Sequence, residues 1–266
     1  MNTSELFESA IQFYEANNLL EAEAICNEII EQDSEHWDAI CLLGMISHKL
    51  TTILPNKAGT LYHLWYYNSR VWHTTSWAGV ITLKSPSDMW NYQEIIFTLK
   101  PSLIIEFGTC CGGSALFFSS ILRQLGQKYK VFSVDISHEN LNPLVRQDAN
   151  IELFLSSSTS PIVAEAITEL QKEYPGAIFA ILDSDHTKEY VLNEMLLLRP
   201  LLKSGDYLIV EDGNINGHPV LPGWGEGPYE ALQEYFTRYP DDYHRDYARE
   251  DKFGFTFATA GFLIRR

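Results

Sequence analysis

The sequence predicts an α/β protein: a doubly wound, mostly parallel sheet of seven strands, preceded by a small α-helical segment. From residue 100 onward, short apolar runs typical of buried strands alternate with stretches typical of helices. Acidic side chains directly follow several of these runs, at the edge where open α/β sheets bind ligands. We therefore expect helices over 1–50, an aromatic-rich connection and lead-in helix over 51–100, and the α/β domain over 101–266.

Residues 4–50 have the periodicity of three short helices, of which the second is expected to bury Leu20. Ala10 and Ala22 are small residues placed where two antiparallel helices approach closely, and Gly44 follows Ala10 by 34 residues. This spacing resembles about one and a half tetratricopeptide units. An ordinary helical hairpin fits the pattern equally well. Either structure would offer a surface for a protein partner or for a second copy of the chain.

The connection over 51–75 is rich in Tyr and Trp, so we expect it to pack against the protein rather than act as a flexible linker. A helix is predicted over Ser87–Leu99, because Ser85 and Pro86 form a typical helix start. The remaining elements alternate. The predicted strands are Leu103–Phe107, Val131–Ile136, Ile151–Leu155, Ile178–Asp183, Tyr207–Glu211 and one or two within Phe253–Ile264, and the predicted helices are Gly113–Leu125, Ile162–Lys172, Glu189–Leu202 and Pro228–Tyr239.

Composition limits the class of protein. An apolar fraction of 45% and a charged fraction of 20% are normal for a globular protein. The net charge of −16 repels phosphate groups, so neither nucleic acid nor an anionic membrane is an expected partner. The chain has no apolar run long enough to span a membrane, no signal-peptide pattern at its start and no CxxC pair among its four cysteines. We expect a cytoplasmic protein that acts on a small molecule.

Three carboxylates are predicted to meet at one edge of the sheet. Asp183 ends one apolar run, and Glu211 and Asp212 end the next, with a predicted helix between them. A crossover helix between parallel strands brings both strand ends to the same edge. Oxygen ligands without a convergent His or Cys set suit a hard cation such as Mg²⁺. The alternative is that these residues are solvated surface charges.

The first predicted strand leads into a glycine-rich turn, E-F-G-T-C-C-G-G-S, which a helix follows. Gly108, Gly112 and Gly113 allow backbone N–H groups to approach a ligand closely. Cys110 replaces the middle glycine of the dinucleotide fingerprint, and Glu106 places a carboxylate where it would repel a phosphate. The turn therefore favours a cationic ligand that lacks phosphate.

Asp135 closes the second predicted strand, where a carboxylate is placed to accept both ribose hydroxyl protons. Ser157, within a run of three serines, follows the third strand and is placed to meet an adenine ring. A carboxylate at a strand end is also often a helix cap or a surface charge. It is the register of Asp135 with the glycine turn that indicates a nucleoside.

These residues fall in one order along the chain, which resembles the S-adenosylmethionine-dependent methyltransferases of the metal-dependent, catechol O-methyltransferase-like type. The motifs W-Y-Y-N-S-R-V-W (65–72), L-D-S-D-H-T (182–187) and V-E-D-G-N (210–214) carry a closer resemblance to the cephalosporin hydroxylase-like group, which includes rhamnosyl O-methyltransferases. The resemblance covers about residues 61–266. The residues in order are Glu106, Gly108, Gly112, Ser114, Asp135, Asp183, Glu211 and Asp212.

The resemblance implies a Mg²⁺-dependent O-methyltransferase that acts on a hydroxyl group of a sugar or natural product. It implies that Asp183, Glu211 and Asp212 hold Mg²⁺, which would acidify and orient the acceptor hydroxyl. His186 is then the expected general base, and Asp185 is a second candidate whose alternative role is to cap the following helix. The residues expected to bind S-adenosylmethionine are Glu106, Gly108, Gly112, Gly113, Ser114, Asp135, Ser157 and Asp183.

The loop Gly213–Pro228 is expected to act as a lid or a substrate wall, because long loops at a ligand edge are commonly functional. Trp65, Tyr66, Trp72 and Trp77 would either stack on the acceptor or belong to the core or a dimer contact.

Two other function classes stay open. A tailoring oxygenase, or an accessory subunit of one, would need an iron site such as His186, His218 and Asp183, but would leave the nucleoside pattern unexplained. A non-catalytic binding module recruited through the N-terminal helices would have no need to retain every proposed ligand.

Overall fold

The computed structural model describes residues 3–16, 18–53 and 55–266 and divides the chain into two compact units, residues 1–61 and 62–266. Residues 1, 2 and 17 of the expected helical segment lie outside the described residues. No helix of the described ranges is long and apolar enough to cross a membrane.

The first unit contains the three expected helices, α1 (Thr3–Glu15), α2 (Leu19–Gln32) and α3 (Trp37–Ile53). Ala10 and Ala22 are fully buried, as their small size predicts. The predicted burial of Leu20 was wrong. Leu20 is 65% exposed, whereas Leu19 is buried, so the apolar stripe begins one residue earlier than expected. The likeness to a tetratricopeptide unit stays a prediction.

Most of the expected connection is helical. It forms α4 (Pro55–Asn68), a 3₁₀ turn (Val71–Thr74) and a hairpin of two short strands, β1 (Ser76–Trp77) and β2 (Val80–Ile81). Aromatic residues have only modest helix propensity, so the local sequence pattern did not predict α4. The lead-in helix is α5 (Pro86–Leu99), with a proline in its first turn as expected.

The second unit is built on the predicted seven-stranded sheet, in the order β5-β4-β3-β6-β7-β9-β8. The first five strands in that order are parallel, and β9 and β8 close the sheet in antiparallel fashion. The strands are β3 (Leu103–Phe107), β4 (Lys130–Asp135), β5 (Ile151–Leu155), β6 (Ile178–Leu182), β7 (Tyr207–Val210), β8 (Tyr243–Arg245) and β9 (Phe262–Arg265).

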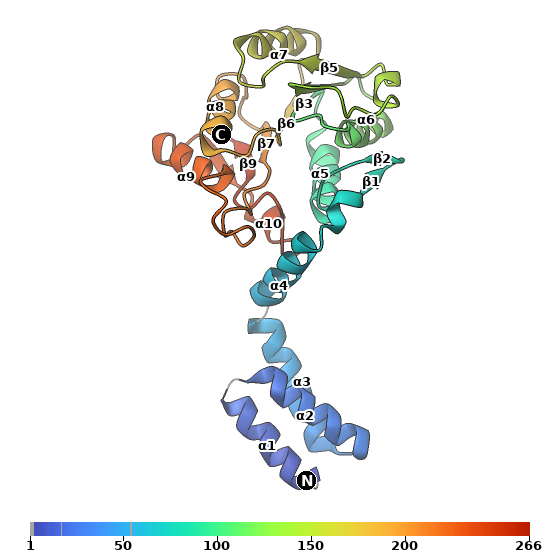
Figure 1. Ribbon diagram of the computed structural model, residues 1–266, viewed down its shortest axis with the longest axis vertical. Coiled ribbons are helices and arrows are strands. Elements are labelled where there is room, and N and C mark those ends of the chain that lie inside the picture. Colours follow the sequence, from blue (N-terminus) through green and yellow to red (C-terminus); the bar gives the residue numbers. More distant parts are fainter. Residues whose placement is uncertain (1–2, 17, 54) are drawn as a thin grey trace. The chain divides into compact units, whose positions relative to one another are not determined.

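Helices cover both faces of this sheet (Figure 1). One apolar layer packs α5 and α6 against the sheet, and the other packs α7, α8 and α9 against the opposite face. The central strands β3, β6 and β7 are buried along their whole length, which explains their uninterrupted apolar runs. The helices of this unit are α6 (Gly113–Leu125), α7 (Pro161–Glu173), α8 (Lys188–Leu198), α9 (Pro228–Arg238) and the short α10 (Tyr247–Glu250), with a second 3₁₀ turn at Val145–Gln147.

The closing strands differ from the prediction. Only the end of the segment Phe253–Ile264 is a strand, and the other closing strand, β8, lies earlier in the chain. Gly254 and Ala260 have positive φ angles of 78° and 60°, which interrupt an extended strand. The preceding segment is therefore a loop, and its Phe257 packs against Tyr66 and Trp72.

Candidate functional site

The sheet brings the predicted residues to one edge. Phe107 pairs with Leu182, and Leu182 pairs with Val210, so the residues that follow these three strands are neighbours. At Gly108 a β-carbon would lie 1.9 Å from the carbonyl oxygen of Asp183, and the φ angle is 100°. Only glycine allows the turn after β3 to lie this close to the end of β6.

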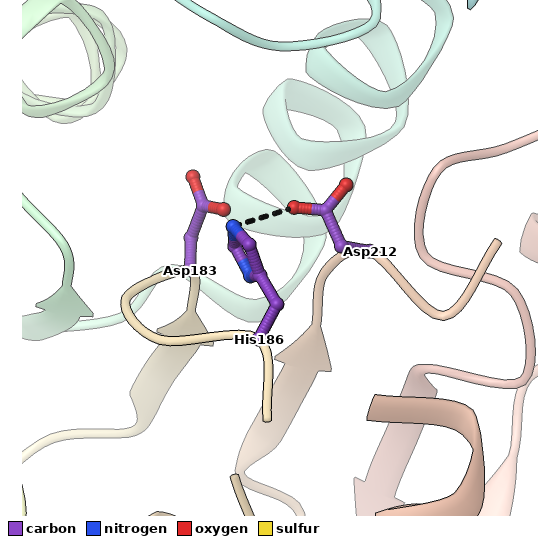
Figure 2. Close-up of side chains that lie close together, drawn as sticks. All are labelled: Asp183, His186 and Asp212. Atoms are coloured by element: carbon purple, nitrogen blue, oxygen red, sulfur yellow. Dashed lines mark ion pairs between the residues drawn. The ribbon is translucent and has the colours of Figure 1, made fainter. Parts of the chain in front are cut away.

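Asp183, His186 and Asp212 form a group that can hold a metal ion, with one ligand atom from each lying within 4.8 Å of the others. Figure 2 shows the two carboxylates at the ends of neighbouring strands, with the imidazole on the loop between them. The His186 Nε2 atom lies 3.2 Å from Asp212 Oδ2. Two carboxylates and one imidazole on adjacent strand ends can bind a divalent cation or share a proton.

Glu211 points to the same edge but has different partners. Its Oε1 atom accepts hydrogen bonds from Lys84 Nζ at 3.0 Å and from the Tyr92 hydroxyl at 2.6 Å. Lys84 Nζ also lies 2.6 Å from Asp183 Oδ2. The geometric group and the predicted ligand set share Asp183 and Asp212, and the role of Glu211 as a ligand stays a prediction.

The charges at this edge shift one another's pKa. Burial raises the pKa of the Glu211 carboxyl, and the Lys84 ammonium opposes that rise. Burial also raises the pKa of Asp212, against the effect of His186. Burial alone would lower the pKa of His186, but Asp212 and Asp183 outweigh it, so the pKa of the imidazole is raised. The edge therefore holds a proton or a cation readily.

Asp185 stabilises the turn before α8 but does not cap the helix, whose N-cap residue is Thr187. It is exposed, and its Oδ1 atom accepts the backbone N–H of Thr187, just before α8, at 2.8 Å. Hydrogen bonding to Thr187, through its side chain first and its backbone N–H second, lowers the pKa of the Asp185 carboxyl. Its candidacy as a base stays a prediction.

The glycine turn is held by Asp135. One oxygen of this carboxylate accepts the backbone N–H of Cys110 at 2.8 Å, and the other accepts that of Ser137 at 3.0 Å. A β-carbon on Gly113 would lie 2.0 Å from Thr82 Oγ1, so the hairpin segment packs directly on the start of α6. Gly112, with a φ angle of 81°, and the buried Ser114 complete the turn.

Glu106 lies within β3 and is fully buried beneath the turn. The Ser133 hydroxyl donates to its Oε2 atom at 2.5 Å, while Oε1 has no hydrogen-bond partner among the described residues. Burial raises the pKa of this carboxyl to about 7. A role in cofactor binding stays a prediction for Glu106.

Two adjoining cavities meet at the turn. The first, of about 360 Å³, is bounded by the glycine turn, by Asp183, His186 and Asp212, and by the aromatic side chains Tyr67, Trp72 and Trp224. The second, of about 310 Å³, is lined by Asp135, Ser156, Ser158 and Tyr190 among others. Gly108, Cys110, Asp183 and Ser184 line both cavities.

Ser157 does not line these cavities; its Oγ atom lies 2.7 Å from the hydroxyl of Tyr190, which lines the second one. Of the aromatic residues considered for stacking, Trp72 borders the first cavity. Tyr66 is buried and Trp65 is exposed, while Trp77 packs edge-on against Phe117.

The loop after β7 borders the first cavity through Ile215, Leu221 and Trp224. His218 does not join the metal-binding group, because its Nε2 atom lies 2.9 Å from Glu230 Oε1. The iron site considered as an alternative is therefore not assembled among the described residues.

Sequence reasoning assigned no role to Lys84 and Tyr92. No local signal marks Lys84, because Thr82 and Lys84 are buried while Ile81 and Leu83 are exposed, the reverse of what their hydropathy predicts. A lysine in such a pattern is expected to be solvated, since lysine is almost never fully buried unless it is paired. Its carboxylate partners, 99 and 127 residues later, could not be identified from the local pattern.

The family described as Rhamnosyl O-methyltransferase/CmcI matches residues 69–266. A rhamnosyl O-methyltransferase of Mycobacterium leprae (strain TN) is 58% identical over 226 residues, which is 85% of this chain and 96% of that protein. One of Mycobacterium tuberculosis (strain ATCC 25618 / H37Rv) is 59% identical over 204 residues, which is 77% of this chain and 83% of that protein.

Among solved structures, a CmcI structure named with Mg and S-adenosylmethionine has a TM-score of 0.58 at 23% identity, covering 73% of this chain and 77% of that one. A CmcI structure named with S-adenosylhomocysteine has a TM-score of 0.57 at 21% identity, covering 73% and 84%. The fold is thus shared with these structures.

Proposed function

The chain belongs to the Rhamnosyl O-methyltransferase/CmcI family, and from this premise we propose that it transfers the methyl group of S-adenosylmethionine to a hydroxyl group of a sugar, with rhamnosyl compounds as the first candidates. The proposal rests on one observation: two neighbouring cavities share the glycine turn. One cavity lies beside Asp135 and the other beside the metal-binding group.

On the cofactor side, the turn offers close backbone approach at Gly108 and a carboxylate at Asp135. Asp135 would accept the ribose hydroxyls, and Ser156 and Ser158 would border the adenine. The absence of a basic side chain from the described lining of this cavity fits a cofactor without phosphate. Cys110 and Gly108 line both cavities, so the sulfonium would lie between them.

On the acceptor side, the donor set fits a hard divalent cation, because Asp183 and Asp212 supply oxygen atoms beside the imidazole of His186. Asp183, Asp212 and the second oxygen of Glu211 would hold Mg²⁺. When bound, Mg²⁺ would lower the pKa of a chelated hydroxyl and orient it. Tyr67, Trp72 and Trp224 provide aromatic surface for a sugar ring in the same cavity.

His186 would accept the proton of the acceptor hydroxyl. Its contact with Asp212 fixes the orientation of the ring, and in the metal-free site the neighbouring carboxylates raise its pKa. Asp185 is less suited to this task, because it is engaged by Thr187 and its pKa is lowered. An oxygenase reaction is not supported, since His218 pairs with Glu230.

The test combines calorimetry with a transfer assay. We expect the full chain to bind S-adenosylmethionine and, with Mg²⁺, to add one methyl group to a rhamnoside, detected by mass spectrometry. Asp135→Ala should weaken cofactor binding. Asp33→Ala is the matched control, because Asp33 likewise accepts a backbone N–H two residues ahead but lies in the other unit. Absence of cofactor binding by the wild type, with and without Mg²⁺, defeats the proposal.

A further inference from the structure

Lys84 is an unusual residue for its surroundings. Only 3% of its side chain is exposed, although lysine is among the residues least often buried. Its ammonium nitrogen lies 2.6 Å from Asp183 Oδ2 and 3.0 Å from Glu211 Oε1. The side chain is therefore a buried cation held by two carboxylates.

These two carboxylates follow neighbouring parallel strands at the edge where the metal-binding group lies. The contact with Lys84 occupies Oδ2 of Asp183 and Oε1 of Glu211. Tyr92, which is fully buried in α5, donates to the same Glu211 oxygen. Each carboxylate thus has one oxygen fixed from the hairpin–α5 side and keeps a second oxygen for another ligand.

The charges can be counted. Asp183, Glu211 and Asp212 carry three negative charges when ionised, and Lys84 cancels one of them. With the base His186 in its neutral form, two negative charges remain, which is the number that one divalent cation balances. Without Lys84, three carboxylates would meet at a largely buried edge with no positive charge in contact with either Asp183 or Glu211.

We propose that Lys84 is a resident counter-ion of the cation site and that Tyr92 is a positioning residue for it. Lys84 holds Asp183 and Glu211 together before Mg²⁺ binds, and Tyr92 holds Oε1 of Glu211, so that the opposite oxygen stays in place for Mg²⁺. This role rests on the proposed function. It differs from a merely structural role, in which Lys84 only fastens the segment before α5 to the sheet.

The two roles differ in how they depend on the cation. In Lys84→Met, the repulsion among the carboxylates is worst when the site is empty, and Mg²⁺ supplies part of the missing charge. We therefore expect the fall in Tm of this variant to be larger in a chelator than in saturating Mg²⁺, measured on the full chain with S-adenosylhomocysteine present. An equal fall in both conditions overturns the proposal.

The matched control is Lys188→Met. Lys188 also pairs with two carboxylates, Glu226 and Glu234, both at 3.1 Å, but outside the metal-binding group. Its fall in Tm should not depend on Mg²⁺. If Lys84→Met does not fold in chelator, the double variant Lys84→Met/Glu211→Gln should fold, because one negative charge is removed with the positive one. Failure of the double variant to fold also overturns the proposal.

Tyr92→Phe tests positioning without a change of charge. Loss of its hydroxyl should weaken Mg²⁺ binding by about tenfold in calorimetry, because Glu211 loses one of its two donors. Tyr207→Phe removes a similar hydroxyl–carboxylate contact, to Asp246, at the other end of β7 and should leave Mg²⁺ binding unchanged. Equal Mg²⁺ binding in wild type and Tyr92→Phe overturns the positioning role of Tyr92.

Measurements on the wild type distinguish a failure of the proposed function from a failure of the counter-ion role alone. A wild-type chain that shows neither a binding heat nor a rise in Tm with Mg²⁺ defeats the cation site and with it the Mg²⁺-dependent function. A wild type that responds to Mg²⁺, beside a Lys84→Met variant whose fall in Tm is independent of Mg²⁺, defeats only the counter-ion role.

Discussion

The glycine turn lies beside the cation edge, by which we mean the sheet edge that carries Asp183, Glu211 and Asp212. The two are built from different kinds of contact. The turn is held by a backbone N–H and a carboxylate 25 residues apart, Cys110 and Asp135, within one strand–helix–strand unit. At the cation edge, backbone hydrogen bonds place Asp183 and Glu211, and the side chain of Lys84 joins them across 99 and 127 residues of sequence.

This difference indicates which kind of substitution should disrupt the turn and which should disrupt the cation edge. A turn made from backbone depends on dihedral angles and on the absence of a β-carbon, so its failure is geometric. An edge made from buried charges depends on their sum, so its failure is electrostatic. Changes at the turn should therefore act on cofactor affinity, whereas changes at the cation edge should act on turnover and on the response to Mg²⁺.

The largest effect is expected at the cation edge. Asp212→Asn removes one carboxylate of the metal-binding group, and this carboxylate is also the partner of His186. We expect kcat to fall on the order of 100- to 1,000-fold, because metal-assisted activation contributes several kcal/mol. S-adenosylhomocysteine affinity, measured by calorimetry, should stay close to that of the wild type. A large loss of cofactor affinity would contradict the proposal that the turn, and not the cation edge, determines cofactor binding.

The next effect distinguishes the two candidate bases. His186→Gln should lower kcat by about 100-fold, the lower end for general-base catalysis, because a bound cation would still acidify the hydroxyl. A base must be unprotonated, so the wild-type rate should fall as the pH drops below the pKa of His186, and the variant should lack this fall. Asp185→Asn should remain within about threefold of wild type; a larger loss would reassign the base.

The contrast between local and distant contacts also explains what the sequence could predict. The sheet, its flanking helices and the turn depend on periodicity and glycine spacing, and these predictions agree with the structure. Asp183, Glu211 and Asp212 could be brought together by topology alone, because each directly follows a parallel strand.

Other features depend on contacts that no local pattern encodes. The partners of Lys84 and Tyr92 lie far away in the chain. The helical character of α4 was hidden by its aromatic residues, several of which pack with the loop residue Phe257. The strand β8 is three residues long and lies at the edge of the sheet, where the periodic signal is weakest.

A geometric test applies to the glycine turn. Gly108→Ala should weaken cofactor binding at least tenfold, because the new β-carbon would lie 1.9 Å from the Asp183 carbonyl oxygen. Gly126→Ala is the control: its φ angle of 68° is also positive, but no atom lies within 4 Å of the added carbon. We expect it to cost about 1 kcal/mol of stability with unchanged cofactor affinity. Equal effects of the two substitutions would contradict a role for close approach.

The smallest effect concerns an electrostatic feature on the cofactor side of the molecule. Glu194 of α8 is fully buried and accepts hydrogen bonds from Ser158 and Ser184, which line the second cavity. Burial raises the pKa of this carboxyl to about 7 from 4.5. The folded protein therefore binds a proton more tightly than the unfolded chain, so this group destabilises the fold increasingly as the pH rises from about 4.5 to 7.

Glu194→Gln removes that titration. The difference in Tm between the variant and the wild type should shift in favour of the variant by a few degrees between pH 5 and pH 8, on the order of 2–3 kcal/mol, whatever constant offset the new amide introduces. Glu165→Gln, an exposed change on α7, should show no such shift. A pH-independent difference for Glu194→Gln would mean that its carboxyl is not perturbed, and the cofactor side would then be governed by backbone geometry alone.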